Sequence, residues 1–309
     1  MADIILHQYP QSPVAEKVRV GLGIKHLYWR SVEIPRIPPK PDLIPLTGGY
    51  RRTPVMQIGA DVYCDSQCIL RELERRFPQP GYFPAQGGGL SWGLSRWTDD
   101  RFFGETIKLV LAGQGDNLPA DFAEDRGRLY MGPDWQQALL QARSELAHLS
   151  SQIRGQLAWV NDWLGACEFM TGSHAGVADA CVYYLVWFVR GRYDGGAQLL
   201  SEFPNLLDWE QRVAAIGHGS SEALSAEAAL AIARESEVET LQLHDKNDPQ
   251  QLVPGMAVSV KPDVNAGEMA VDGIVHAVSS DTISLLRESE QTGQVCVHFP
   301  RVGYRVDVQ

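Results

Sequence analysis

The chain has 309 residues, of which 44% are hydrophobic, and its formal net charge is −11 at pH 7. A chain of this size and composition is expected to form two or three globular domains. The acidic balance argues against nucleic-acid binding, because phosphate contacts require basic side chains. No apolar run approaches the roughly 20 residues that cross a bilayer, and the N-terminus shows no signal-peptide pattern. We therefore expect a cytoplasmic protein without a membrane segment.

The cysteines are few and scattered, and no two of them form a C-x-x-C pair. They are Cys64, Cys68, Cys167, Cys181 and Cys296. This usage predicts buried, unreactive thiols and no disulfide framework. No cluster of His and Cys residues in the sequence completes a metal-ligand set, so we predict no metal site.

The start of the chain predicts a β-α-β unit. The apolar residues 3–8 and the alternating segment Tyr28 to Glu33 are expected to be strands. Between them, Ser12 followed by Pro13 is a strong helix start, with Ser at the N-cap and Pro at the first helical position. Two strands joined through one helix are expected to be parallel, with a right-handed crossover.

A hairpin and a second helix are expected next. Thr53 to Ile58 and Ala60 to Cys64 read as strands on either side of Gly59. Asp65 to Phe77 has the apolar spacing of an amphipathic helix, and either Asp65 or Ser66 is its N-cap.

The middle of the chain reads as helices. A linker rich in Pro and Gly, residues 78–90, precedes them and marks a domain boundary. Trp135 to Leu164 is one long periodic segment, and Val177 to Arg190 is apolar enough to be the central core helix. Ser221 to Arg234 is expected to be the last helix.

The last part of the chain changes to short alternating segments rich in Val. Five such segments between Leu252 and Val308 predict a small antiparallel β-barrel. This part is acidic, which disfavours nucleic-acid binding by it. The predicted domains are therefore residues 1–84, 90–236 and 250–309.

Three motifs in the first domain resemble the cytosolic glutathione transferase family, in particular its serine-type members. They are Tyr9-Pro10-Gln11-Ser12-Pro13, Arg52-Thr53-Pro54-Val55-Met56-Gln57 and Cys64-Asp65-Ser66. The resemblance covers residues 3–84 well and 90–236 more loosely, and the tail lies outside it. It implies a thioredoxin-like α/β domain, an all-helical domain, glutathione as cosubstrate, a small electrophilic substrate and a homodimer.

The resemblance also implies a glutathione-binding site in the first domain. A cis peptide at Pro54 exposes the backbone of Thr53, which pairs with the extended ligand as an added strand would. At a helix N-terminus, Ser66 and the free N–H groups favour the γ-glutamyl carboxylate, and Asp65 receives the ligand's ammonium. Arg52, or alternatively Arg51, meets the glycyl carboxylate.

Two residues compete for the catalytic role. Ser12, at a helix N-terminus, can donate its hydroxyl to the glutathione sulfur and favour the thiolate. The phenol of Tyr9, three residues earlier, can do the same. No Cys begins this helix, which argues against thiol–disulfide exchange.

One family feature is altered in the second domain. The capping box that opens the central helix carries Ser or Thr in the family, but the matching residues here are Gly176 and Asp179. Ser173 is a possible substitute for the missing hydroxyl.

Two functions follow from these observations. The first is an enzyme, a transferase of the detoxifying type, in which glutathione attacks an electrophile by conjugation, dehalogenation, isomerisation or peroxide reduction. The second is a binding or regulatory module without turnover, whose C-terminal β domain contacts a protein partner.

Overall fold

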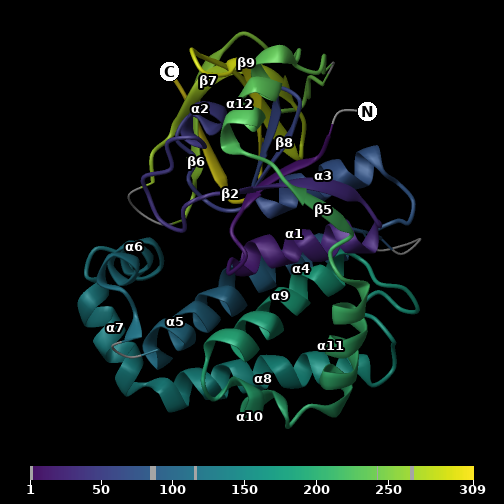
Figure 1. Ribbon diagram of the computed structural model, residues 1–309, viewed down its shortest axis with the longest axis vertical. Coiled ribbons are helices and arrows are strands. Elements are labelled where there is room, and N and C mark those ends of the chain that lie inside the picture. Colours follow the sequence, from purple (N-terminus) through teal and green to yellow (C-terminus); the bar gives the residue numbers. More distant parts are fainter. Residues whose placement is uncertain (1–2, 84–87, 115–116, 242, 265–267) are drawn as a thin grey trace. The chain divides into compact units, whose positions relative to one another are not determined.

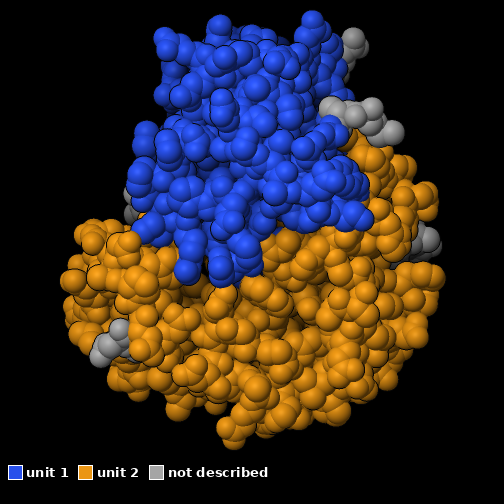
Figure 2. All heavy atoms as spheres, in the orientation of Figure 1, with its two compact units in different colours: residues 1–15, 28–73, 220–309 blue, residues 16–27, 74–219 orange. Residues whose placement is uncertain are grey.

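The structure, a computed structural model, describes residues 3–83, 88–114, 117–241, 243–264 and 268–309. Residues 84–87 of the predicted linker lie outside this described part. Contacts divide the chain into two compact units, which Figure 2 colours separately. Unit 1 contains Met1–Ala15, Tyr28–Leu73 and Ser220–Gln309, and unit 2 contains Glu16–Leu27 and Glu74–Gly219.

The N-terminal elements follow the predicted order. They are β1 (Ile5–Gln8), α1 (Pro13–Ile24), β2 (Tyr28–Glu33), α2 (Ile44–Thr47), β3 (Val55–Ile58), β4 (Asp61–Cys64) and α3 (Ser66–Arg76). β1 pairs in parallel with β2 and antiparallel with β3, and β3 pairs antiparallel with β4. Gly59 turns the hairpin with a φ of 61°, a conformation that Gly adopts readily. The predicted β-α-β unit and hairpin are confirmed.

The five predicted C-terminal strands also form. They are β6 (Ala257–Pro262), β7 (Val271–Val278), β8 (Thr282–Ser289), β9 (Gly293–Pro300) and β10 (Tyr304–Val308). Each pairs antiparallel with its neighbours, but β9 also pairs in parallel with β4. The result is one ten-stranded sheet in the order β10-β6-β7-β8-β9-β4-β3-β1-β2-β5. The sequence predicted the strands but not this continuation of the N-terminal sheet.

A buried network of hydrogen-bonded side chains joins β4 to the C-terminal strands. The imidazole of His298 on β9 bonds Asp61 on β4 through Nε2 (2.9 Å) and Ser284 on β8 through Nδ1 (2.8 Å). The ring of Tyr63 stacks on that of His298, with centroids 4.4 Å apart. All three hydrogen-bonding residues are less than 5% exposed. Buried polar groups that are paired in this way specify one register, since a slip would leave them unpaired.

The apolar core of unit 1 is likewise shared between the two ends of the chain. Val55 and Val62 from the hairpin belong to the same buried cluster as Val297 and Phe299 from β9. The C-terminal strands therefore contribute to the core that the N-terminal strands need.

One segment within the range predicted as all-helical is a strand. β5 (Ser220–Ala223) pairs in parallel with β2, and the last helix, α12 (Ala226–Glu235), begins only after it. Gly217 and Gly219 have φ values of 68° and 72°, and these left-handed turns redirect the chain after the preceding helix. Ser225 then caps α12 by accepting a hydrogen bond from the N–H of Ala228.

Unit 2 consists of helices. Besides most of α1 and the end of α3, they are α4 (Gly88–Trp97), the π-helix η1 (Thr98–Phe102), α5 (Phe103–Gly113), α6 (Ala120–Met131), α7 (Trp135–Ser144), α8 (Leu146–Leu164), α9 (Val177–Arg192), α10 (Gly196–Leu200) and α11 (Pro204–Ile216). The predicted long segment is broken at Glu145 into α7 and α8. The buried helix α9 contacts α4, α5, α10 and α11, as expected of a central helix (Figure 1). Among the described residues, no helix combines the length and apolar character that a membrane span requires.

Asp179 organises the start of α9. Its carboxylate accepts hydrogen bonds from the N–H groups of Gly176 and Met170 and from the indole of Trp209, at 2.7 to 2.8 Å. Ser173 bonds His174 instead of substituting for the missing capping hydroxyl. A Cβ at position 176 would lie 2.4 Å from the carbonyl oxygen of Tyr82, which explains why Gly stands there.

Restoring the family's hydroxyl residue at position 176 is therefore expected to destabilise the protein. We predict that Gly176→Ser lowers the free energy of unfolding by about 1–3 kcal/mol, because the Cβ forces the Tyr82 backbone to move. The matched control is Gly155→Ala in α8, where an added Cβ meets no described atom within 4 Å. That change should raise stability by about 0.5–1 kcal/mol. Denaturant unfolding of both variants checks the prediction, and an unchanged midpoint for Gly176→Ser would contradict it.

Candidate functional site

The strand register brings the three predicted motifs to one end of the sheet in unit 1. His7 near the end of β1 lies opposite Val55 at the start of β3, and Val55 lies opposite Cys64 at the end of β4. The segments that follow β1, precede β3 and follow β4 therefore lie at the same end of these strands. These segments contain the predicted site residues Tyr9, Ser12, Arg52, Thr53, Pro54, Asp65 and Ser66.

The Thr53–Pro54 turn has the geometry that the resemblance implies. The peptide bond is cis, and Pro54 is buried. Among the described residues, neither the backbone N–H nor the C=O of Thr53 has a hydrogen-bonding partner. An extended ligand can therefore pair with this backbone as an edge strand does.

Lys40, which the sequence analysis did not single out, supports this turn. Its ammonium donates to the carbonyl of Arg51 and to Oγ1 of Thr53, each at 2.9 Å, and its side chain is 4% exposed. A buried lysine with these partners links the residues on either side of Arg52 and so stabilises the turn. Its position in an irregular segment offered no periodicity from which to predict the contact.

The N-terminus of α3 presents a carboxylate and a hydroxyl. Asp65 has a φ of 78° and is the cap, since its Oδ1 accepts from the N–H of Gln67 at 2.8 Å. The hydroxyl of Ser66 makes no hydrogen bond to any described residue. With the positive end of the helix dipole beside them, these groups can receive an ammonium on Asp65 and a carboxylate on Ser66.

Ser12 caps α1, as predicted. Its Oγ accepts a hydrogen bond from the N–H of Ala15 at 3.2 Å, and its own N–H bonds the carbonyl of Tyr9. The hydroxyl proton has no acceptor among the described residues and can be donated to a ligand atom. The side chain is 2% exposed.

Tyr9 is a core residue of unit 1. Its side chain is 7% exposed and belongs to the apolar cluster with Ile34 and Tyr50. Packing in this core accounts for an aromatic side chain at this position.

The arginine predicted to meet a ligand carboxylate is paired with a residue of the C-terminal part. Arg52 donates through Nε and Nη2 to the carboxylate of Glu268, and through Nη2 to the carbonyl of Val264. The alternative, Arg51, has its Nε 3.9 Å from the same carboxylate. Burial lowers the pKa of Arg52, but the hydrogen bond and charge of Glu268 outweigh it, so the net pKa is raised.

Asp65 also has a partner in the C-terminal part. Tyr304 on β10 donates to its Oδ2 at 3.0 Å and lies 3.2 Å from the hydroxyl of Tyr50. Burial, with the charge of Asp65, raises the pKa of both phenols well above the ordinary value. Both therefore remain protonated near neutral pH, and Tyr304 acts as a donor that orients the carboxylate.

The thiols near the site are unreactive. Cys64 and Cys68 are buried, and burial raises the pKa of each thiol well above its ordinary value. A neutral thiol is a poor nucleophile, in agreement with the predicted inert cysteines.

One grouping of possible metal ligands escaped the sequence analysis. The donor atoms of Asp61, Cys296 and His298 all lie within 4.8 Å of one another in the interior of unit 1. The register of β4 with β9 brings them together, across 235 and more positions of the chain. The hydrogen bonds of Asp61 and His298 already satisfy these groups, and burial raises the pKa of the Cys296 thiol.

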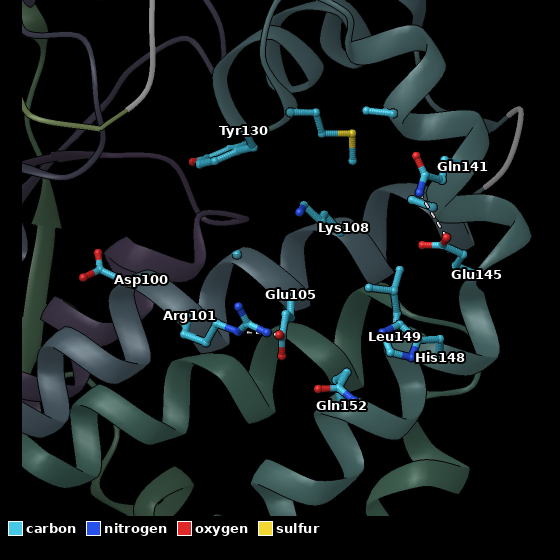
Figure 3. A pocket seen from close by; sticks show the side chains of 14 residues that line it. Asp100, Arg101, Glu105, Lys108, Tyr130, Gln141, Glu145, His148, Leu149 and Gln152 are labelled. Atoms are coloured by element: carbon cyan, nitrogen blue, oxygen red, sulfur yellow. Dashed lines mark hydrogen bonds and ion pairs between the residues drawn. The ribbon is translucent and has the colours of Figure 1, made fainter.

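A pocket of about 460 Å³ lies within unit 2 (Figure 3). Lys108, Tyr130 and His148 are among its lining residues, and its lining also includes the ion pair of Arg101 with Glu105. Its walls combine apolar side chains with polar ones, and the charged side chains among them carry both signs. None of the residues predicted to bind glutathione lines it.

Comparisons with known proteins agree with this architecture. Residues 6–81 match the glutathione S-transferase N-terminal domain. A solved GST-like protein from Pseudomonas syringae is 34% identical over 100% of both chains, with a TM-score of 0.79. Glutathione S-transferase III in its apo form (18% identity, 69% of this chain and 92% of the other, TM-score 0.52) shares the fold.

The fold is also shared with the β-etherase LigF from Sphingobium sp. strain SYK-6, which is 17% identical over 69% of this chain and 95% of the other, with a TM-score of 0.52. A comparison with curated proteins found no match. Only the first of these three structures covers the whole chain, C-terminal strands included. Because its 34% identity extends over the full length of both proteins, this chain belongs to the glutathione S-transferase family.

Proposed function

We propose that this protein is a glutathione transferase that binds glutathione in unit 1, where β1 and β4 end and β3 begins, and activates its thiol for attack on a small electrophile. The single observation that carries the proposal is the register of β1, β3 and β4, which gathers the three motifs at one end of these strands. Each motif alone is a common turn or helix cap. Together they offer complementary groups to an extended γ-glutamyl tripeptide.

The ligand would lie along these strand ends, with its γ-glutamyl group at the N-terminus of α3. Asp65 would receive the ammonium, and Ser66 with the free N–H groups of the helix would bind the carboxylate. The backbone of Thr53 would pair with the cysteinyl residue. This orientation directs the thiol toward the N-terminus of α1.

Ser12 would then stabilise the thiolate. Its hydroxyl proton has no acceptor among the described residues, and the N-terminus of α1 favours negative charge. The thiol releases its proton to solvent, and the thiolate forms a bond to the electrophilic centre. Ser12 is preferred over Tyr9 because Tyr9 is part of the apolar core.

The proposed role of Ser12 predicts a shift in the pKa of the bound thiol. In Ser12→Ala, this pKa should rise by about one to two units, equivalent to about 1.4–2.8 kcal/mol, because the donor to the thiolate is lost. Turnover near neutral pH should fall accordingly. The pH dependence of thiolate absorbance in the complex measures the shift, and turnover of aryl halides, isothiocyanates and hydroperoxides measures the activity.

Tyr9→Phe is the matched control, since it removes a hydroxyl while keeping the core packing. It should leave the pKa of the bound thiol unchanged. Equal thiol pKa values in wild type and Ser12→Ala would transfer the role to another group. Failure of the wild-type protein to bind glutathione by calorimetry would remove the proposal as a whole.

A binding module without turnover is the second candidate. The observation that favours it is the engagement of Arg52 and Asp65 by Glu268 and Tyr304 of the C-terminal part. Glutathione binding without turnover of any electrophile in the panel would support this candidate. We also propose a homodimer, which sedimentation equilibrium tests directly.

A further inference from the structure

We propose that Glu268 sets the ligand selectivity of the glutathione site, so that the site prefers a γ-glutamyl-cysteinyl thiol whose glycine end carries no negative charge. Amides and esters of the glycyl carboxylate belong to this class. The inference rests on the proposed function, since it concerns the same site. It goes further by assigning a role to a residue outside the three motifs.

The contact between Arg52 and Glu268 is the first observation. Two nitrogens of the guanidinium donate to the carboxylate, which is the bidentate geometry that gives strong pairs. The side chain of Glu268 is only 6% exposed, whereas that of Arg52 is 26% exposed. Separating the pair would leave a nearly buried carboxylate without its cation, which is unfavourable.

The second observation is that the other arginine faces the same carboxylate. The Nε atom of Arg51 lies 3.9 Å from Oε1 of Glu268. Lys40, the third cation at the turn, donates to the carbonyl of Arg51 and to Thr53. A glycyl carboxylate arriving here would share these cations with Glu268 and experience its negative charge, because the protein surroundings screen the repulsion less than water does.

At the opposite end of the site, Asp65 and Ser66 remain able to bind the γ-glutamyl group. The contact from Tyr304 orients Asp65 without removing its charge, and the hydroxyl of Ser66 has no described partner. The C-terminal part therefore supports one end of the ligand and opposes a charge at the other. Selectivity is thus expected between ligands that differ only at glycine.

The test compares binding of reduced glutathione with binding of its glycine amide by calorimetry, using the full-length chain. We expect the wild-type protein to bind the amide about tenfold more tightly, the effect of one like-charge contact at a partly exposed site. In Glu268→Gln the preference should move toward glutathione by about the same factor. Glu288→Gln, which removes an exposed charge from β8, is the matched control and should keep the wild-type ratio.

The outcomes separate this inference from the function on which it rests. Equal binding of the two ligands by the wild-type protein, or a ratio unchanged in Glu268→Gln, overturns the role of Glu268 while leaving the glutathione site intact. Absence of binding for both ligands overturns the proposed function and the inference together. The wild-type ratio requires no variant, so it decides the matter even where Glu268→Gln fails to fold.

Discussion

Replacing Asp65 by Asn is expected to weaken glutathione binding roughly 10- to 100-fold, with little change in stability. The ligand's ammonium would lose the carboxylate that receives it, and a hydrogen bond to a charged group contributes about 1.5–3 kcal/mol. Asn is the informative replacement because it removes the negative charge but retains the capping oxygen and the backbone conformation of Asp65. Its side-chain oxygen can still cap α3 through the N–H of Gln67, and it tolerates a φ of 78°.

Calorimetric titration with glutathione, alongside thermal unfolding, measures both quantities. Tyr304→Phe is the control for the contact with the C-terminal part, since it removes the hydroxyl that donates to Asp65 but leaves the carboxylate in place. We expect a much smaller loss of affinity there. Affinity of Asp65→Asn within twofold of the wild-type value would show that the ammonium binds elsewhere.

Removal of the C-terminal strands is the second change with a large expected effect. A chain ending at residue 236 should lose its cooperative unfolding transition. It would lack β6 to β10 and expose β4 as an unpaired sheet edge, with Val62 and neighbouring core residues open to solvent. Each apolar side chain that loses its burial costs about 1.5–3 kcal/mol, and several such losses exceed the roughly 5–15 kcal/mol that stabilise a typical domain.

Circular dichroism and scanning calorimetry of the truncated chain test this expectation. Supplying residues 237–309 as a separate polypeptide should restore the transition, because β9 can again pair with β4 and His298 with Asp61. A truncated chain that unfolds cooperatively near the wild-type temperature would mean that the C-terminal strands form an independent domain.

The elements near the site were predicted well because their signals are local. Ser12 before Pro13, the hairpin around Gly59 and the helix start at Asp65 each depend on the conformational preferences of a few consecutive residues. The same holds for the five C-terminal strands, where the alternation of apolar residues matches the two-residue period of a strand. The segment of β5 was missed because four small or polar residues carry no such period, and its pairing with β2 decides its conformation.

The partners of the site residues could not be predicted. Glu268 lies 216 positions from Arg52, and Tyr304 lies 239 positions from Asp65. No local preference encodes such contacts. They exist because the C-terminal strands join the N-terminal sheet through the pairing of β9 with β4, and because Glu268, before β7, and Tyr304, on β10, then reach Arg52 and Asp65.

The sequence by itself determined most of the helices, strands and turns of this protein, though not β5, and the three motifs that point to a glutathione site. The conformational reason is local, since side-chain size, branching and capping act within a turn or a strand. Only the tertiary structure decided that the last strands extend the first sheet, and that Glu268 contacts Arg52 and Tyr304 contacts Asp65. That outcome depends on the burial of apolar surface and on the hydrogen bond between Asp61 and His298, which are far apart in the chain. The preferences of a single segment do not encode either contribution.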